Sequence, residues 1–126
     1  MVKARLCCGA FLCMALLTTI GLNAADDEKP KYTIEEVMKK AHGKNNLPKK
    51  LAAGTATDKE KEDLVAYYEA LGKNKPPKGD AEGWKKKTDA LLTAAKGAVK
   101  GDKDELAALK KAVNCKACHD VHKPEE

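Results

Sequence analysis

Two cysteines and a histidine near the C-terminus have the spacing of a covalent haem attachment site. Residues 115–119 read Cys-Lys-Ala-Cys-His, which is the pattern of c-type haem attachment. Thiols three positions apart lie on nearly the same side of a helical turn, so both can add to the vinyl groups of one porphyrin. His119 then points toward the iron, and a backbone carbonyl is expected to hold its second ring nitrogen. We predict one haem c bound by Cys115 and Cys118, with His119 as an axial ligand.

Three other interpretations compete with haem. A disulfide between Cys115 and Cys118 would suit a thioredoxin-like redox site, but no βαβ pattern surrounds the two cysteines. A zinc site could use both cysteines with His119 and His122, although zinc ligand pairs usually sit on separate, spaced arms. The third is chance, because three fixed positions in five do recur at random. Export would favour haem, since c-type haem is attached outside the cytoplasm.

The N-terminus predicts export. Residues 1–25 have the pattern of a secretory signal peptide, in which Lys3 and Arg5 precede the uncharged apolar stretch 6–22 and small residues follow it. A retained membrane anchor is the alternative, but the stretch is short for a bilayer span of roughly 20 apolar residues. We therefore expect a cleaved signal, a periplasmic or otherwise exported protein with no stable membrane span, and a mature domain of residues 26–126.

Charge and cysteine content narrow the function classes further. The formal net charge of the whole chain is +5, and it falls to +3 when the two basic residues of the signal peptide are removed. This mild basic balance is not the footprint of a nucleic-acid-binding protein. Three of the five cysteines lie in the signal peptide, so only Cys115 and Cys118 remain in the mature chain. No acid–base constellation indicates an enzyme.

The mature chain predicts an all-α fold. Ala, Leu, Lys and Glu dominate, and Thr-x-x-Glu capping boxes at Thr33 and Thr57 mark two helix starts. We expect an antiparallel four-helix bundle, whose last helix runs directly into Cys115 so that the haem motif forms its final turns. The expected helices span about 33–42, 57–72, 81–100 and 102–119, with a further helical turn at 48–53 and a proline-containing loop at 73–79.

Other prominent side chains have structural interpretations. We expect Trp84, Tyr67 and Tyr68 to pack in the core or against the haem edge. The lysines at 85–87 are expected to form a solvated face; a lysine cluster near the haem edge would steer an acidic redox partner. His122 follows His119 by three residues, so we expect it on the proximal side, at the surface or against a haem propionate.

The motif and its position resemble a known family. A helical bundle with Cys-Lys-Ala-Cys-His-Asp near its C-terminus is similar to the class II c-type cytochromes, which comprise cytochrome c′ and its low-spin relatives. Asp120 and Lys123 also match the tail that follows the family's motif. The resemblance implies a four-helix bundle, a Met ligand on the first helix of low-spin members, and a homodimer through the first two helices. The chain is shorter than typical members and lacks an arginine just before the ligand position.

The sixth iron ligand has three candidates. Only seven residues follow His119 and none is Met, so a second protein ligand must come from upstream. The resemblance implies Met38, which is the only Met outside the signal peptide; His42, four residues later on the same helix face, is the rival. The third candidate is a five-coordinate iron with an open distal face. The first two predict a one-electron carrier that meets redox partner proteins, and the third predicts a protein that binds or senses NO or CO.

Overall fold

The structure is a computed structural model that describes residues 29–125, and this part of the chain is all-helical. The predicted signal peptide lies outside the described residues. The predicted all-α class is confirmed. The helices are α1 (Ile34–Ala41), α2 (Leu47–Ala53), α3 (Asp58–Lys73), α4 (Ala81–Val99), α5 (Lys103–Ala112) and α6 (Cys115–His122).

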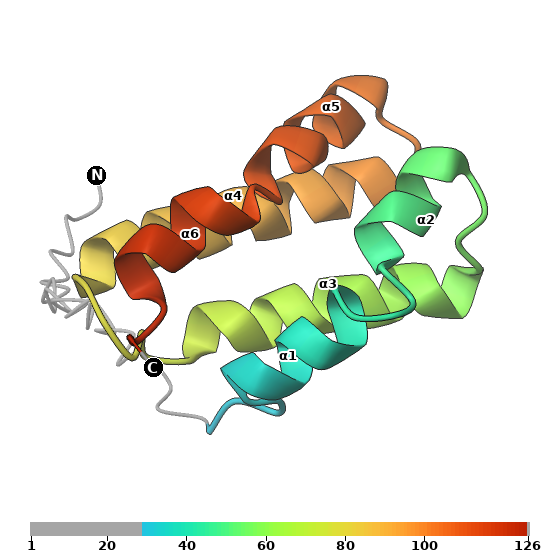
Figure 1. Ribbon diagram of the computed structural model, residues 1–126. Helices are drawn as coiled ribbons and strands as arrows, with labels where there is room; N and C mark the ends of the chain where they lie inside the picture. The colour runs from blue at the N-terminus through green and yellow to red at the C-terminus, as the bar shows by residue number, and fades with distance from the viewer. Residues whose placement is uncertain (1–28, 126) are drawn as a thin grey trace, which may run out of the picture.

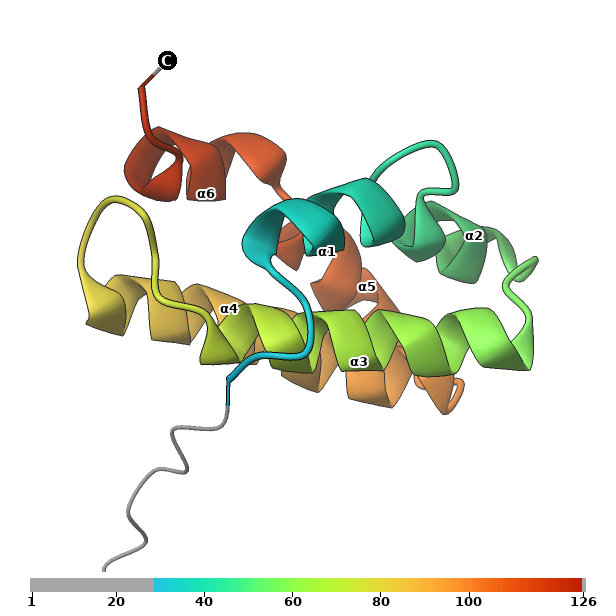
Figure 2. The ribbon, with the colours of Figure 1, turned by 90° about the horizontal axis from the view of Figure 1, so that it is seen from below.

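The two longest helices, α3 and α4, pack against each other. They run antiparallel, because the loop between them reverses the chain (Figure 1). Pro76 and Pro77 in this loop cannot continue a helix. Figure 2 shows α1 and α6 on the same side of the α3–α4 pair. The first and the last helix of the described chain therefore lie on one face of the α3–α4 pair.

Side-chain caps define where the helices begin. Thr33 and Thr57 accept from the backbone N–H of Glu36 and Glu60, and each glutamate accepts from the backbone N–H of its threonine. These are the two predicted capping boxes, each of which satisfies donors that a helix start leaves unpaired. Asp80 caps α4 in a simpler way, by accepting from the backbone N–H three residues later. Local sequence therefore sets these starts.

The core lies between α3 and α4 and takes further buried residues from α1, α2 and α5. Leu64, Tyr68 and Leu71 of α3 are at most 1% exposed, and Trp84 of α4 is 4% exposed. Burying a side chain of this size contributes about 1.5–3 kcal/mol. Val37 of α1 is fully buried against the same cluster. The predicted core packing of Trp84 and Tyr68 is therefore confirmed, whereas Tyr67 is only half-buried.

The prediction of one continuous last helix is wrong. α5 ends at Ala112, and the haem motif lies on a separate helix, α6, that begins at Cys115. Asn114 separates the two helices: its backbone is extended, and its side chain accepts from the backbone N–H of Ala117. An Asn side chain that competes for the backbone in this way favours a new helix start over helix continuation. The expected turn at 48–53 is also a helix of its own, α2, so the described chain has six helices where four were predicted.

Within residues 29–125, no helix is both long and apolar enough to cross a lipid bilayer.

Candidate haem attachment site

The first turn of α6 presents both thiols of the motif. Cys115 is exposed and Cys118 is half-buried, and neither forms a disulfide in the structure. The Asn114 cap starts the helix at Cys115, so the two sulfurs are three residues apart on a regular turn and share one side of it. Burial raises the pKa of the Cys118 thiol. Cys118 also packs against the apolar core, which places the inner edge of the site against the body of the protein.

Contacts from the α3–α4 side hold α6 in place. The ammonium of Lys87 on α4 donates to the carbonyl oxygen of Ala117 at 2.8 Å. Lys78 forms an ion pair with Glu125 just after α6, at 2.9 Å between nitrogen and oxygen. Lys87 therefore has a structural contact inside the motif and is not simply part of a solvated lysine face.

His122 is the main anchor of α6, and the prediction of a surface position is wrong. Its side chain is 2% exposed, its Nδ1 donates to the carbonyl oxygen of Lys78 at 2.9 Å, and its ring meets Trp84 edge-on at 5.3 Å between centroids. Nε2 is buried and has no hydrogen-bond partner within the part of the chain that the structure describes. The carbonyl contact fixes both the tautomer and the ring orientation, so His122 is turned toward the α3–α4 loop.

Gly79 makes this docking possible. Its φ is +82°, a backbone conformation that favours glycine. A Cβ atom at this position would lie 2.8 Å from Nδ1 of His122 and 2.9 Å from the carbonyl oxygen of Val121. Trp84 steadies the same loop, because its indole N–H donates to the carbonyl oxygen of Asn74 at 2.8 Å. The loop between α3 and α4 is therefore shaped to receive the end of α6.

His42 lies at the C-terminal end of α1. It caps the helix by donating its backbone N–H to the carbonyl oxygen of Met38. Nε2 of His42 lies 3.3 Å from the hydroxyl oxygen of Tyr68, and the two rings are stacked with centroids 5.7 Å apart. Burial, and secondly the charge of His119, lower the pKa of His42. The imidazole is therefore close enough to His119 for the two to interact electrostatically.

Tyr68 links the two sides of this site. Its side chain is fully buried, and its pKa is raised mainly by burial and further by the charge of Cys115. The hydroxyl oxygen of Tyr68 lies 3.3 Å from Nε2 of His42, at the C-cap of α1. The sequence predicts Tyr68 in the core or against the haem edge, but it does not predict the contact with His42, which joins residues 26 positions apart.

Met38 lies one helical turn before His42 and has a different environment. It is half-buried and packs against the apolar core cluster. The structure thus places Met38 on α1 and His42 at the C-cap of that helix. His42 contacts the hydroxyl of Tyr68, and the charge of His119 in the motif contributes to its lowered pKa.

The residues present fit a covalently attached haem. Two unbonded thiols share one side of α6, and His119 follows them and is exposed. His42, at the C-cap of α1, is near enough for the charge of His119 to lower its pKa. Among residues 29–125, no group of three or more His, Cys, Asp or Glu side chains is arranged to hold a metal ion directly. His122, the fourth ligand of the zinc alternative, lies against the α3–α4 loop, where its Nδ1 donates to the carbonyl oxygen of Lys78.

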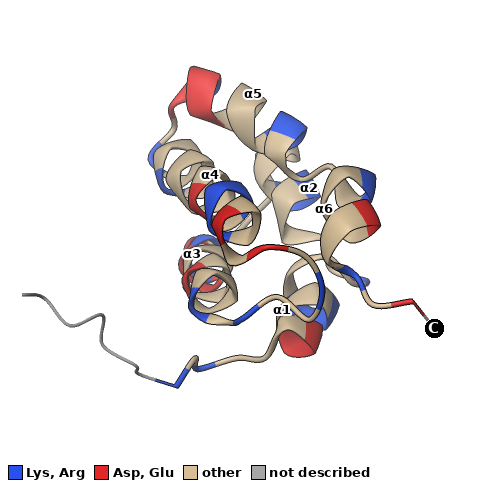
Figure 3. Ribbon diagram, turned by 90° about the vertical axis from the view of Figure 1, so that its left-hand side faces the viewer, with Lys and Arg blue, Asp and Glu red and all other residues tan. Residues whose placement is uncertain are grey.

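The charged surface near the motif mixes both signs. Figure 3 shows acidic and basic residues close together on α4 and on α6. Several of the lysines form ion pairs one helical turn away, which neutralises part of the expected basic face. These pairs are Lys85–Asp89 (2.6 Å), Lys86–Glu82 (2.9 Å) and Lys116–Asp120 (2.9 Å).

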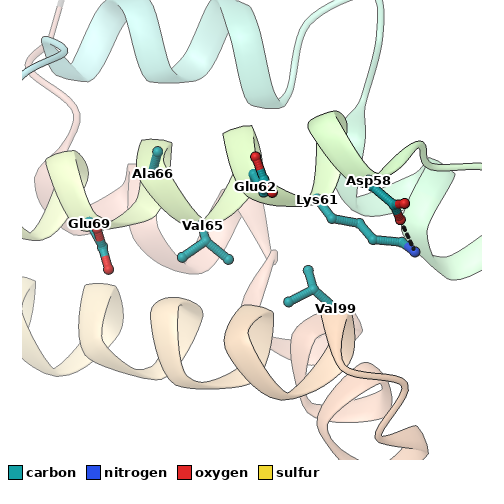
Figure 4. A pocket seen from close by; sticks show the side chains of 7 residues that line it. All are labelled: Asp58, Lys61, Glu62, Val65, Ala66, Glu69 and Val99. Carbon is teal, nitrogen blue, oxygen red and sulfur yellow. Dashed lines mark hydrogen bonds and ion pairs between the residues drawn. The ribbon is translucent and has the colours of Figure 1, made fainter.

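A shallow pocket elsewhere on the surface does not involve the motif. It lies along α3 and the end of α4, and Figure 4 shows its lining side chains, which include Glu62, Val65, Glu69 and Val99. An ion pair between Lys61 and Asp58 closes one end. None of the lining residues belongs to α1 or α6, so the pocket is separate from the candidate haem site.

Comparisons with known proteins give no family for this chain. No protein-family model matches it, and no curated protein or solved structure is significantly similar to it.

Proposed function

We propose that this chain is a monohaem c-type cytochrome that carries single electrons between redox partner proteins in the periplasm or another exported compartment. The observation that carries the proposal is the Cys-Lys-Ala-Cys-His sequence on a capped helix, with both thiols unbonded and with His42 near enough for the charge of His119 to lower its pKa. In this proposal α1, α3, α4 and the α5–α6 segment correspond to the four-helix bundle of the class II cytochromes.

Each residue of the site has a defined part in the proposal. Cys115 and Cys118 bind the porphyrin covalently, and His119 is the proximal iron ligand. The bound haem supplies an iron that cycles between the ferric and ferrous states. His122 and Lys87 hold α6 against the body of the protein, so the proximal ligand stays fixed while the electron is gained or lost.

The proposal is tested by asking whether haem is attached covalently. The full chain is expressed with its N-terminal segment in a bacterium that carries a c-type cytochrome maturation system. We expect the purified protein to have the mass of one added haem, a pyridine haemochrome spectrum typical of two thioether bonds, and a reversible one-electron redox titration. The Cys115→Ala/Cys118→Ala double variant should carry no covalent haem.

Lys116→Ala is the matched control, because it changes an exposed residue inside the same motif. It should carry haem at the wild-type level. A well-folded wild-type protein with two free thiols and no haem would refute the proposal. Rapid binding of CO to the ferrous wild-type protein would instead support a gas-binding function, because a carrier with two protein ligands leaves no iron position open.

A further inference from the structure

We infer that His42 is the second axial ligand of the iron and that Tyr68 positions it, so that the haem has bis-histidine coordination. The inference rests on the proposed function, because it assigns the distal side of the same haem site.

His42 lies at the C-cap of α1, and α1 and α6 lie on the same side of the α3–α4 pair (Figure 2). Burial lowers the pKa of His42, and the charge of His119 on α6 lowers it further. Two imidazoles that approach each other from helices on one face can bind a single iron from opposite sides. Imidazole is also the commonest metal-binding side chain in proteins.

The hydroxyl group of Tyr68 orients the imidazole of His42. It lies 3.3 Å from Nε2 of His42, and the tyrosine itself cannot move easily because it is fully buried in the core. A ligand histidine is usually oriented by a hydrogen-bond partner that is itself fixed. Tyr68 has this role here: it is a positioning residue that acts through His42.

Met38 and His42 have different environments. The Met38 side chain packs with the apolar core, which is the ordinary role of a flexible, polarizable residue. His42 is instead a half-buried polar group whose Nε2 contacts the hydroxyl of Tyr68. Coordination would therefore be through Nδ1 of His42, and it would leave the packing of Met38 unchanged.

Spectroscopy of the ferric wild-type holoprotein is the primary test. Electron paramagnetic resonance and near-infrared magnetic circular dichroism distinguish bis-histidine iron from histidine–methionine iron. We expect a low-spin bis-histidine signature and no absorption band from a methionine–iron bond. A methionine–iron band, or a high-spin five-coordinate spectrum, would overturn the inference. This measurement needs no variant, so it does not depend on any substitution being tolerated.

Two matched variants on the same helix then assign the ligand. His42→Ala should convert the iron to a high-spin form that binds CO when ferrous, and added imidazole should restore the low-spin spectrum. Met38→Leu should keep the wild-type spectrum and reduction potential. The opposite pattern, with Met38→Leu becoming high-spin and His42→Ala staying low-spin, would overturn the inference.

Tyr68→Phe tests the positioning role, because it removes the hydroxyl and keeps the ring that packs in the core. We expect a low-spin spectrum with shifted g values and a changed reduction potential. Unchanged g values and potential would overturn the part given to Tyr68. Failure of the inference can be told from failure of the proposed function, because a protein without covalent haem refutes the function and a haem protein with another ligand refutes only the inference.

Discussion

Gly79 gives the sharpest test of how α6 is held. Replacing it with Ala introduces two costs. The first is the left-handed backbone at φ +82°, which costs an L-residue roughly 1–2 kcal/mol. The second is steric, because the new Cβ would lie 2.8 Å from Nδ1 of His122 and 2.9 Å from the carbonyl oxygen of Val121. Overpacking of this kind typically costs about 1–3 kcal/mol.

Gly54 is a matched control for the backbone cost alone. Its φ is +72°, and a Cβ atom there would meet no atom within 4 Å. Gly54→Ala should therefore lower the free energy of unfolding by roughly 1–2 kcal/mol. Gly79→Ala should lower it by a further 1–3 kcal/mol or so, which is the steric cost of displacing the end of α6.

Urea denaturation of the two holoprotein variants, followed by circular dichroism, measures the difference. Part of the excess cost of Gly79→Ala should disappear in a His122→Ala background, because one of the two clashing groups is then gone. Equal stabilities for Gly79→Ala and Gly54→Ala, within about 0.5 kcal/mol, would show that the α3–α4 loop does not hold α6 as described.

Three further predictions concern the helices around the site. Thr33→Ala removes the capping box of α1 and should cost about 1 kcal/mol in urea denaturation, whereas Thr33→Ser should cost much less. The hydrogen bond from the backbone N–H of Gly83 lowers the pKa of Asp80 from 3.8, so its contribution is present above that value and is lost as the pH falls through the lowered pKa. Asp80→Asn should accordingly lose stability less steeply than wild type below about pH 4 in acid titrations. In the haem-free chain, amides of α6 should exchange with solvent faster than those of α3 and α4, and equal protection measured by hydrogen exchange would contradict this.

Local sequence signals predicted what local interactions determine. The caps at Thr33 and Thr57 were predictable because a capping box is complete within four residues. The break at Asn114 does not follow from the sequence pattern, because the apolar spacing of Leu109 and Val113 favours a helix that continues into Cys115. An Asn side chain can either stay in such a helix or cap a new one, and in the structure it accepts from the backbone of the next turn.

The candidate site combines local and distant signals. Cys115, Cys118 and His119 stand close together in the sequence, and the chemistry of covalent haem attachment would fix their spacing. The burial of His122 depends on Lys78, which is 44 residues away in the sequence. No periodicity within α6 carries that information, since the loop that receives His122 is shaped by Gly79 and by packing against Trp84.

The break at Asn114 has a consequence for the order in which the protein is completed. Every buried apolar residue of the core lies before it, the last being Leu109, and α6 adds one buried side chain, His122. If haem is attached as proposed, the helices from α1 to α5 can gather their apolar residues while α6 is still accessible to the enzymes that would add it. The segment that would have to stay accessible longest is then the one that contributes least to the apolar core.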